Sequence, residues 1–430
     1  MDRVVAYQCP GETRPISHSL HLARLAAGHP GCQSCQHRNE TGWLPAHIVA
    51  RARSRTHRQV DSLITPDGLR GRYINQLTRE KISDIVERLV EMLAGECVRE
   101  GVRHSSHGLR ILTGYDSRPT SPDLAIGLVS TLKKWGCEIA DLGQASRPQF
   151  DGALERLRPD AGLFLTGGNR NQAWNGLDII DHHGLPWCLP GKLQELGNRL
   201  SQTSNRTSRI PGRYESISLT AEYETGLSRQ FHAIRPLRLA VISPDPLIRN
   251  FLKRQLEQTS CSVMFLTGQY LTEAGNDRSS KIMVETLCER RLDAGFVIGA
   301  DGRSCRLFDE GGYELTLQEM LTLLNQTIVT SVSDGPCWIA HSHPPAETIT
   351  LQGRWLTTGT EADLLLAQRM ERIPIAADSA HRFWFRDESP ACDAIQALAK
   401  VLEVLSLSER PVSSYRTSRK QTQIAEPHRS

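Results

Sequence analysis

Cysteine and histidine residues near the start of the chain are spaced so that they could bind a metal ion. Cys32 and Cys35 are separated by two residues, a spacing that lets one tight turn present two thiolates to a tetrahedral zinc ion. Cys9 could supply a third thiolate, and His21 is our preferred fourth ligand because it falls within a predicted short helix, residues 16–27. Three cysteines and one histidine leave no open position for water. The pattern therefore predicts a structural zinc site.

Two alternatives to this assignment stay open. His18, one helical turn earlier, could take the place of His21, and the three cysteines could be unrelated thiols in a loosely folded tail. A segment of about 50 residues with few large apolar side chains needs a staple such as a metal ion to fold alone. We therefore expect residues 1–59 to form a small zinc module.

A second group of polar residues follows a predicted buried strand. Residues 160–179 read DAGLFLTGGNRNQAWNGLDI, in which an apolar run breaks into a polar glycine turn before a second apolar stretch. This segment resembles the catalytic serine loop of the α-D-phosphohexomutase family, the phosphoglucomutases and phosphomannomutases. In that family Thr-Ala-Ser-His-Asn-Pro follows the strand, and the serine carries the phosphoryl group. An alignment without gaps from Thr166 to Gly176 places Gly168 at the serine position.

Other segments resemble the same family in the same order along the chain, over roughly residues 60–408. Residues 65–71 resemble a loop that faces the active site, and residues 111–121 resemble a strand and loop with an Asp-x-Arg pair. Residues 293–304 stand where the family has its metal loop, and residues 376–381 resemble its sugar-specificity loop. The resemblance implies a cleft lined by Arg70, Asp116, Arg118, Arg170, Arg303, Ser379 and His381.

The chain departs from the family at the groups that carry the chemistry. The side chain of glycine has no oxygen that could accept a phosphoryl group, so with Gly168 at the serine position we expect no catalytic residue there. Thr166, two residues earlier, is a weak substitute because its side chain should point in another direction. The three metal-binding aspartates correspond to Gly299, Asp301 and Arg303. One carboxylate beside a cation does not suit Mg²⁺, which requires octahedral oxygen ligands, so magnesium is not expected.

The sugar loop and the end of the chain also depart from the family, and two of the polar residues have simpler structural explanations. Ala377 replaces the glutamate that would accept sugar hydroxyls, and Asp301 is better read as a turn former than as a metal ligand. The Asp-x-Arg pair could equally be a salt bridge at a strand end. In place of a fourth domain with a phosphate-binding loop, residues 409–430 are rich in Ser, Thr and Arg, a composition typical of a disordered tail.

The elements that must position these residues alternate between apolar runs and helical patterns. Strands are expected at 109–114, 138–142, 161–166, 237–243, 263–266 and 295–299, and helices at 123–135, 246–259, 278–291 and 393–404. Repeated β-α-β units predict tandem three-layer α/β/α domains with largely parallel sheets. After the Cys/His-rich extension we expect three domains, at 60–200, 201–330 and 331–408.

Composition limits the classes of partner. The 430 residues are 39% hydrophobic with a net charge of +3, so there is no overall attraction to nucleic acid, and the arginines at 51, 53, 55 and 58 are read as a solvated linker. No apolar stretch approaches the ~20 residues that span a bilayer, and no export signal is evident, so membrane binding is not expected and a cytoplasmic location is. Most of the 11 cysteines are isolated in apolar contexts and should be reduced.

Three functions are consistent with these observations. The first is a catalytically silent phosphohexomutase homologue that retains a hexose phosphate or a protein partner. The second is an active intramolecular phosphotransferase with a rearranged site. The third is a scaffold or regulatory protein that uses its zinc module and basic tail to bind partners.

Overall fold

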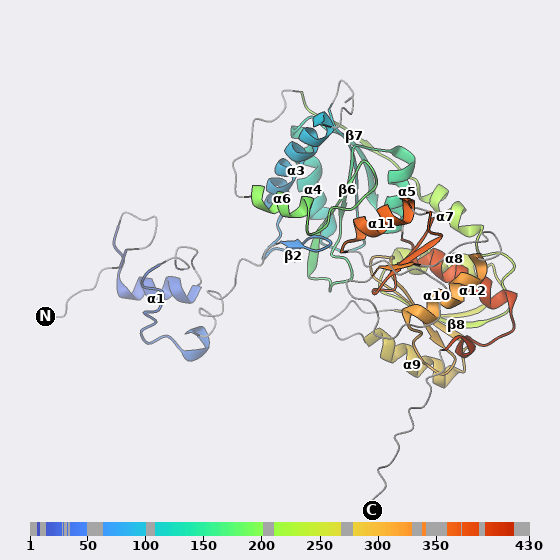
Figure 1. The fold of residues 1–430 in the computed structure, drawn as a ribbon. Helices are drawn as coiled ribbons and strands as arrows, with labels where there is room; N and C mark the ends of the chain where they lie inside the picture. Colours follow the sequence, from blue (N-terminus) through green and yellow to red (C-terminus); the bar gives the residue numbers. More distant parts are fainter. Residues whose placement is uncertain are drawn as a thin grey trace, which may run out of the picture. The chain divides into compact units, whose positions relative to one another are not determined.

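The chain divides into two compact units, Met1–Leu63 and Ile64–Ser430. A computed structural model describes residues 7–8, 14–27, 29, 32, 35–49, 63–99, 108–200, 210–267, 278–328, 338–340, 359–370, 372–386 and 392–416. Figure 1 shows the path of the chain through both units.

The first unit contains the helix α1 (His18–Ala27), and residues 46–49 are helical as well. The helix buries Leu22 and Leu25 together with His21, so its apolar face is continued by an imidazole. An antiparallel bridge between Tyr7 and Ile16 brings the preceding segment back to the start of this helix. The predicted helix at 16–27 is therefore confirmed.

The second unit opens with a seven-stranded sheet in the order β1-β2-β6-β5-β3-β4-β7. Its strands are β1 (Ile64–Thr65), β2 (Gly68–Arg72), β3 (Arg110–Tyr115), β4 (Glu138–Gln144), β5 (Ala161–Leu165), β6 (Trp174–Asp181) and β7 (Arg213–Ser216). Strands β5, β3, β4 and β7 run parallel, whereas β1, β2 and β6 form an antiparallel edge. All five residues of β5 are buried, as expected for a central strand covered on both faces.

Helices cover both faces of this sheet, which makes the first domain three-layered (Figure 1). The helices α3 (Arg79–Arg99), α4 (Ser121–Lys134) and α6 (Lys192–Arg199) lie on one face, and α5 (Arg147–Leu157) lies on the other. Phe150 and Leu154 of α5 pack with Leu112 and Phe164 of the sheet. Strand β7 lies beyond residue 200, where the domain boundary is predicted from the sequence, and it still pairs with β4 of this first sheet.

A second sheet has the order β11-β10-β8-β9, and a third has the order β12-β13-β14. Their strands are β8 (Arg238–Ser243), β9 (Ser262–Thr267), β10 (Ala294–Ile298), β11 (Cys305–Asp309), β12 (Trp338–Ala340), β13 (Ile375–Asp378) and β14 (Phe383–Phe385). The accompanying helices are α7 (Thr220–Ser228), α8 (Pro246–Leu256), α9 (Arg278–Arg290), α10 (Leu317–Ile328), α11 (Glu361–Met370) and α12 (Ala394–Leu407). One hydrophobic core runs through the second and third sheets, with α10 and α12 between them.

The residues after α12 correct part of the disordered tail expected at 409–430. A short 3₁₀ helix, Val412–Tyr415, buries Val412 and Tyr415 in the core shared by α10 and α12. Arg416 then forms an ion pair with the fully buried Asp309 of β11. Two buried apolar side chains and one ion pair are enough to fix these residues, although the composition around them is polar. Residues 417–430 lie outside the described part of the chain.

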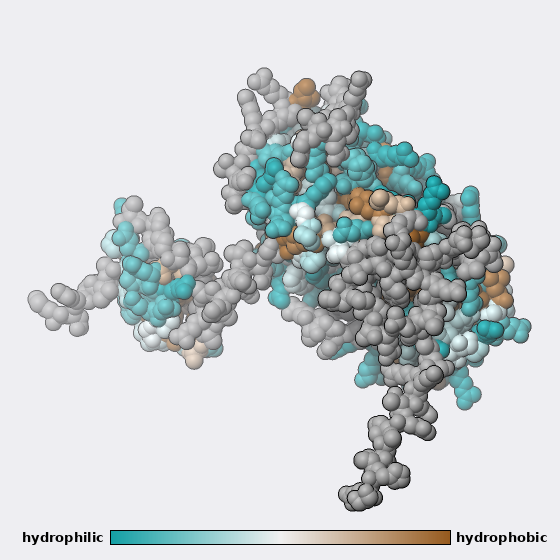
Figure 2. Space-filling view, in the orientation of Figure 1, coloured by the Kyte–Doolittle hydropathy of each residue, from teal (hydrophilic) through white to brown (hydrophobic). Residues whose placement is uncertain are grey.

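On the face seen in Figure 2, the described surface of the second unit is mostly hydrophilic. A small apolar area is visible over α11, the helix that exposes Leu366 and Met370. In the described part of the chain, no helix combines the length and hydropathy needed to cross a bilayer.

Candidate functional site

The polar turn after β5 is held in place by Asp116 and Arg118, which follow β3. The Asp116 carboxylate accepts the N–H of Gly167 at 3.3 Å, and Arg118 forms an ion pair with it. One terminal nitrogen of Arg118 donates to the carbonyl oxygens of Gly168, at 2.7 Å, and Arg170, at 2.8 Å. Both side chains are almost fully buried. These contacts favour the structural reading of the Asp-x-Arg pair, in which it shapes the turn.

Gly168, at the position that the resemblance gives to serine, leaves space beside Arg70. Its φ is +59°, and an added Cβ would lie 3.7 Å from Nε and 3.8 Å from Nη2 of Arg70. The nearest hydroxyl along the turn belongs to Thr166, which is 2% exposed and accepts the N–H of Gly168 at 2.9 Å. Its burial and its contact with the backbone make this hydroxyl poorly placed to attack a phosphoryl group.

Arg70, on β2, is buried and only partly paired. Its Nη2 donates to Asp178 at 2.5 Å, and Asp178 also pairs with Arg147. The Nε of Arg70 is buried without a hydrogen-bond partner. Buried donors are usually satisfied, so an unpartnered one beside an open space indicates a ligand position.

Two other charged groups lie near this donor. Burial alone would raise the pKa of Asp67, but the charge of Arg70 and the hydrogen bond from Thr65 outweigh it and hold the pKa below its usual range. The guanidinium of Arg170 lies 5.6 Å from the centre of the Trp174 ring, a cation–π arrangement. Burial lowers the pKa of Arg170. Arg70 and Arg170 thus lie beside the turn that Arg118 holds in place.

The turn after β10 takes the place of a metal loop but does not fit magnesium. The Asp301 carboxylate accepts the N–H of Arg303 at 3.0 Å, so this lone carboxylate serves its own turn. The N–H of Asp301 lies 3.4 Å from the side-chain oxygen of Asn169, which brings this turn against the Gly168 turn. A Cβ on Gly299 would approach that oxygen to 2.7 Å and would also collide with Ser304. A carboxylate therefore cannot be restored at 299 without displacing both neighbours.

Arg303 points away from the Gly168 turn, toward Glu361 at the start of α11. The two form a buried ion pair, and Glu361 also pairs with Arg382 at 2.8 Å. Burial alone would raise the pKa of Glu361, but the charges of Arg303 and Arg382 prevail and lower it to about 2. Glu361 was not predicted from the sequence, because no motif marks it and its partner is far away along the chain.

The sugar-loop residues separate in the structure. Ser379 lines a cleft of about 210 Å³ together with Asp67, Leu189 and Arg382, between the first and third sheets. His381 is not among the residues that line this cleft. Its Nε2 is buried without a partner, and burial lowers its pKa. Ser379 therefore lines the cleft, whereas His381 lies outside its lining, and the predicted role of both residues in ligand binding stays a prediction.

The predicted zinc ligands lie in the first unit. Cys9 falls outside the described residues, while Cys32 and Cys35 are buried. The Nε2 of His21 is 3.1 Å from the carbonyl oxygen of Glu40, and because a carbonyl only accepts, this nitrogen carries the proton and leaves Nδ1 with a lone pair. Among the described residues, no three His, Cys, Asp or Glu side chains are grouped to hold a metal ion. The zinc site stays a prediction.

Comparison with known proteins agrees with the resemblance. Residues 62–202 match the family described as phosphoglucomutase/phosphomannomutase, alpha/beta/alpha domain I. The structure is similar to that of a phosphoglucomutase/phosphomannomutase family protein from Burkholderia thailandensis, with a TM-score of 0.68 and 17% identity over 83% of this chain and 79% of the other. The chain thus matches the α-D-phosphohexomutase family in domain I and resembles its members in overall fold. The three-layer α/β fold expected from the sequence is confirmed.

Curated proteins of this family are distant in sequence. A probable phosphoglucosamine mutase of Pyrococcus furiosus is 24% identical over 270 residues, which cover 61% of this chain and 58% of that protein. The phosphomannomutase/phosphoglucomutase of Pseudomonas aeruginosa is 22% identical over 317 residues, covering 70% of this chain and 66% of that protein. The chain thus spans about three fifths of the length of the first of these phosphohexomutase relatives.

Proposed function

We propose that this phosphohexomutase homologue binds a hexose phosphate in the space beside Gly168, next to the cleft lined by Asp67 and Ser379, and does not transfer its phosphoryl group. The observation that carries the proposal is the unpartnered Nε of Arg70, which faces the space that a side chain at 168 would occupy. A phosphate oxygen placed there would satisfy this buried donor. A guanidinium group is well suited to this role because its N–H groups match phosphate geometry.

The neighbouring side chains support binding and argue against transfer. Arg170 adds a second positive charge, and Ser379 supplies a hydroxyl in the adjoining cleft. No side chain of the turn offers an exposed hydroxyl, and the lone Asp301 carboxylate with Arg303 nearby would not hold a divalent ion. Binding would then rest on charge and hydrogen bonds, with no covalent step.

Isothermal titration of the full chain with glucose 1-phosphate, mannose 1-phosphate, their 6-phosphates and glucosamine 6-phosphate tests this proposal. We expect at least one of them to bind at millimolar concentration or below, and Arg170→Gln to weaken that binding about tenfold through loss of a charge-assisted contact. Arg110→Gln, at an exposed position on the same sheet, is the matched control. Absence of heat with every sugar phosphate at millimolar concentration would contradict the proposal.

The active-mutase alternative is tested separately. The purified chain is incubated with each hexose phosphate, a sugar bisphosphate activator and Mg²⁺, and the peptide containing 160–176 is then analysed by mass spectrometry. We expect no turnover and no phosphorylated side chain. Turnover accompanied by a phosphate on Thr166 would establish a rearranged phosphotransferase in place of a silent one.

A scaffold role is favoured by one further observation, the compactness of the first unit on its own. We infer that residues 1–59 hold a structural zinc ion and present a surface to a protein partner. Co-purification from cells with and without residues 1–59 tests the inference. Loss of an associated protein, with the second unit still folded, is the expected result, and an unchanged set of associated proteins would contradict it.

A further inference from the structure

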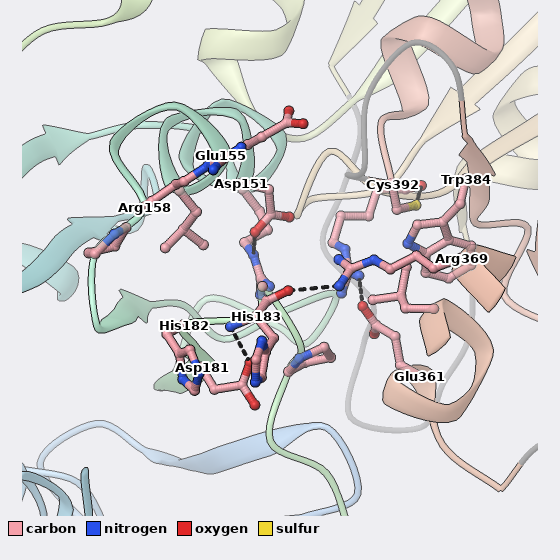
Figure 3. A pocket seen from close by; sticks show the side chains of 17 residues that line it. Asp151, Glu155, Arg158, Asp181, His182, His183, Glu361, Arg369, Trp384 and Cys392 are labelled. Carbon is pink, nitrogen blue, oxygen red and sulfur yellow. Dashed lines mark hydrogen bonds and ion pairs between the residues drawn. The ribbon is translucent and has the colours of Figure 1, made fainter. Parts of the chain in front are cut away.

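A larger cavity lies apart from the cleft, between α5, the turn after β6 and α11 (Figure 3). Its volume is about 370 Å³, within the range of sites that hold small metabolites. The proposed function does not use it. The polar side chains of its lining include Arg147, Asp151, Arg158, His182, His183 and Arg369.

Most carboxylates around this cavity already have partners, although Arg147 and Lys192 are each shared with a second carboxylate outside it. Glu361 pairs with two arginines, and Asp151 accepts from Nε of Arg147 at 2.9 Å. Asp181 accepts two backbone N–H groups of the following turn, each at 3.0 Å, and pairs with Lys192 at 3.3 Å. These groups have little remaining capacity to bind a cation, so the acidic side chains do not set the charge of the ligand.

Two arginines of the lining have no ion pair with any described residue. Arg369 donates through Nη1 to the carbonyl of His183 at 2.7 Å, a bond visible in Figure 3, and its other nitrogens form no ion pair with a described residue. Arg158, which ends α5 in a left-handed conformation, likewise forms no ion pair within the described chain. Both arginines are exposed, and Glu155 is the one carboxylate beside them at the rim.

The turn after β6 adds two imidazoles to this rim. Adjacent histidines on an extended chain should point to opposite faces, so the sequence pattern predicts an exposed loop here. The structure has a turn instead, which places the rings of His182 and His183 3.8 Å apart, both lining the cavity. Both rings therefore lie on the wall of the cavity beside Arg369.

We propose that this cavity is a second site, which binds a small phosphate-bearing molecule through Arg158, Arg369 and the His182–His183 turn. The two exposed guanidinium groups give this rim N–H donors and positive charge that suit a phosphate dianion. The lining of this cavity shares only Glu361 with the cleft that Ser379 lines, and it includes neither Gly168 nor Arg70. A ligand here would contact both α11 and the first domain.

Two measurements with simple anions test the proposal: the position of a bound anion in crystals, and the affinity of the protein for phosphate in solution. Crystals of the full chain are soaked in tungstate, a heavy phosphate analogue, and inorganic phosphate is titrated into the protein by calorimetry. We expect tungstate between Arg158 and Arg369, and two classes of phosphate site in solution. The double variant Arg158→Gln/Arg369→Gln should weaken one class at least tenfold and leave the other unchanged.

The control variants separate this proposal from that for the cleft. Arg156→Gln changes an exposed arginine of the same helix that does not line the cavity, so both classes should persist. Arg170→Gln should weaken only the class that belongs to the cleft. If the double variant, folded as judged by circular dichroism, binds phosphate with unchanged affinity and stoichiometry, or if tungstate avoids the cavity, the second site is disproved.

Discussion

The carboxylate of Glu361 forms a buried ion pair with the guanidinium of Arg303, although the two residues are 58 positions apart. Arg303 stands at a position where relatives in the family have a metal-binding aspartate. Its charge is therefore neutralised by α11 and not by a bound ligand. The pair connects the turn after β10 to the helix before the third sheet.

Replacing Glu361 by Gln should destabilise the chain markedly. Removal of one partner of a buried ion pair leaves an uncompensated charge and typically costs about 3 kcal/mol. Urea unfolding of the second unit, followed by tryptophan fluorescence, should show an earlier midpoint for this variant. Glu289→Gln, at an exposed position of α9, is the control, and a midpoint shared by both variants would show that water can replace the pair.

The same pair should make stability depend on pH in the acid range. The pKa of Glu361 is lowered from 4.5 to about 2, so the unfolded chain takes up this proton before the folded chain does. The contribution of the pair is complete above pH 4.5 and is lost as pH falls toward about 2. The difference in unfolding free energy between wild type and Glu361→Gln should shrink over this window. A difference that stays constant down to pH 2 would argue against the ion pair.

Restoring the missing hydroxyl should not restore mutase activity. Gly168→Ser places a hydroxyl near Arg70, at a cost of about 1 to 2 kcal/mol because a left-handed φ disfavours a side chain. The metal loop would still contain one carboxylate and Arg303, so phosphoryl transfer would lack its cation. Turnover of glucose 1-phosphate with Mg²⁺ and a bisphosphate activator measures this. Activity in the variant would show that the serine alone had been missing.

The zinc prediction can be checked by metal analysis. The full chain purified without chelator should contain about one zinc ion per molecule, and Cys32→Ser/Cys35→Ser should contain none. Circular dichroism should show loss of helical signal from the first unit alone. Cys288→Ser, which changes an exposed cysteine of the second unit, is the control. A metal-free wild type would indicate that the cysteines are separate buried thiols.

Much of the fold could be predicted because its signals are local. The apolar run at β5 predicts a strand, and the amphipathic pattern at α8 predicts a helix. The ends of both elements in the structure differ from the predicted ends by only a few residues. The same is true of the Gly168 turn, since its departure from the family is visible in the sequence itself. Composition misled at Val412 and Tyr415, where two buried side chains fix an otherwise polar segment.

The partners of buried charges could not be predicted in this way. The resemblance implies that Arg303 and Arg118 face a ligand, but the structure assigns their guanidinium groups to Glu361 and to backbone carbonyls. Such pairings depend on how distant segments pack, and the residue types alone do not reveal them. Likewise, only the turn conformation brings His182 and His183 together.

Glu361 borders both the cleft and the larger cavity, so one side chain is common to two chambers. Any molecule that repositions this carboxylate from one chamber must alter the surroundings offered to a molecule in the other. Thermodynamic linkage requires that influence to be equal in both directions. If each of the two proposed sites takes its ligand, the affinity of the chain for one molecule would therefore report the concentration of the other.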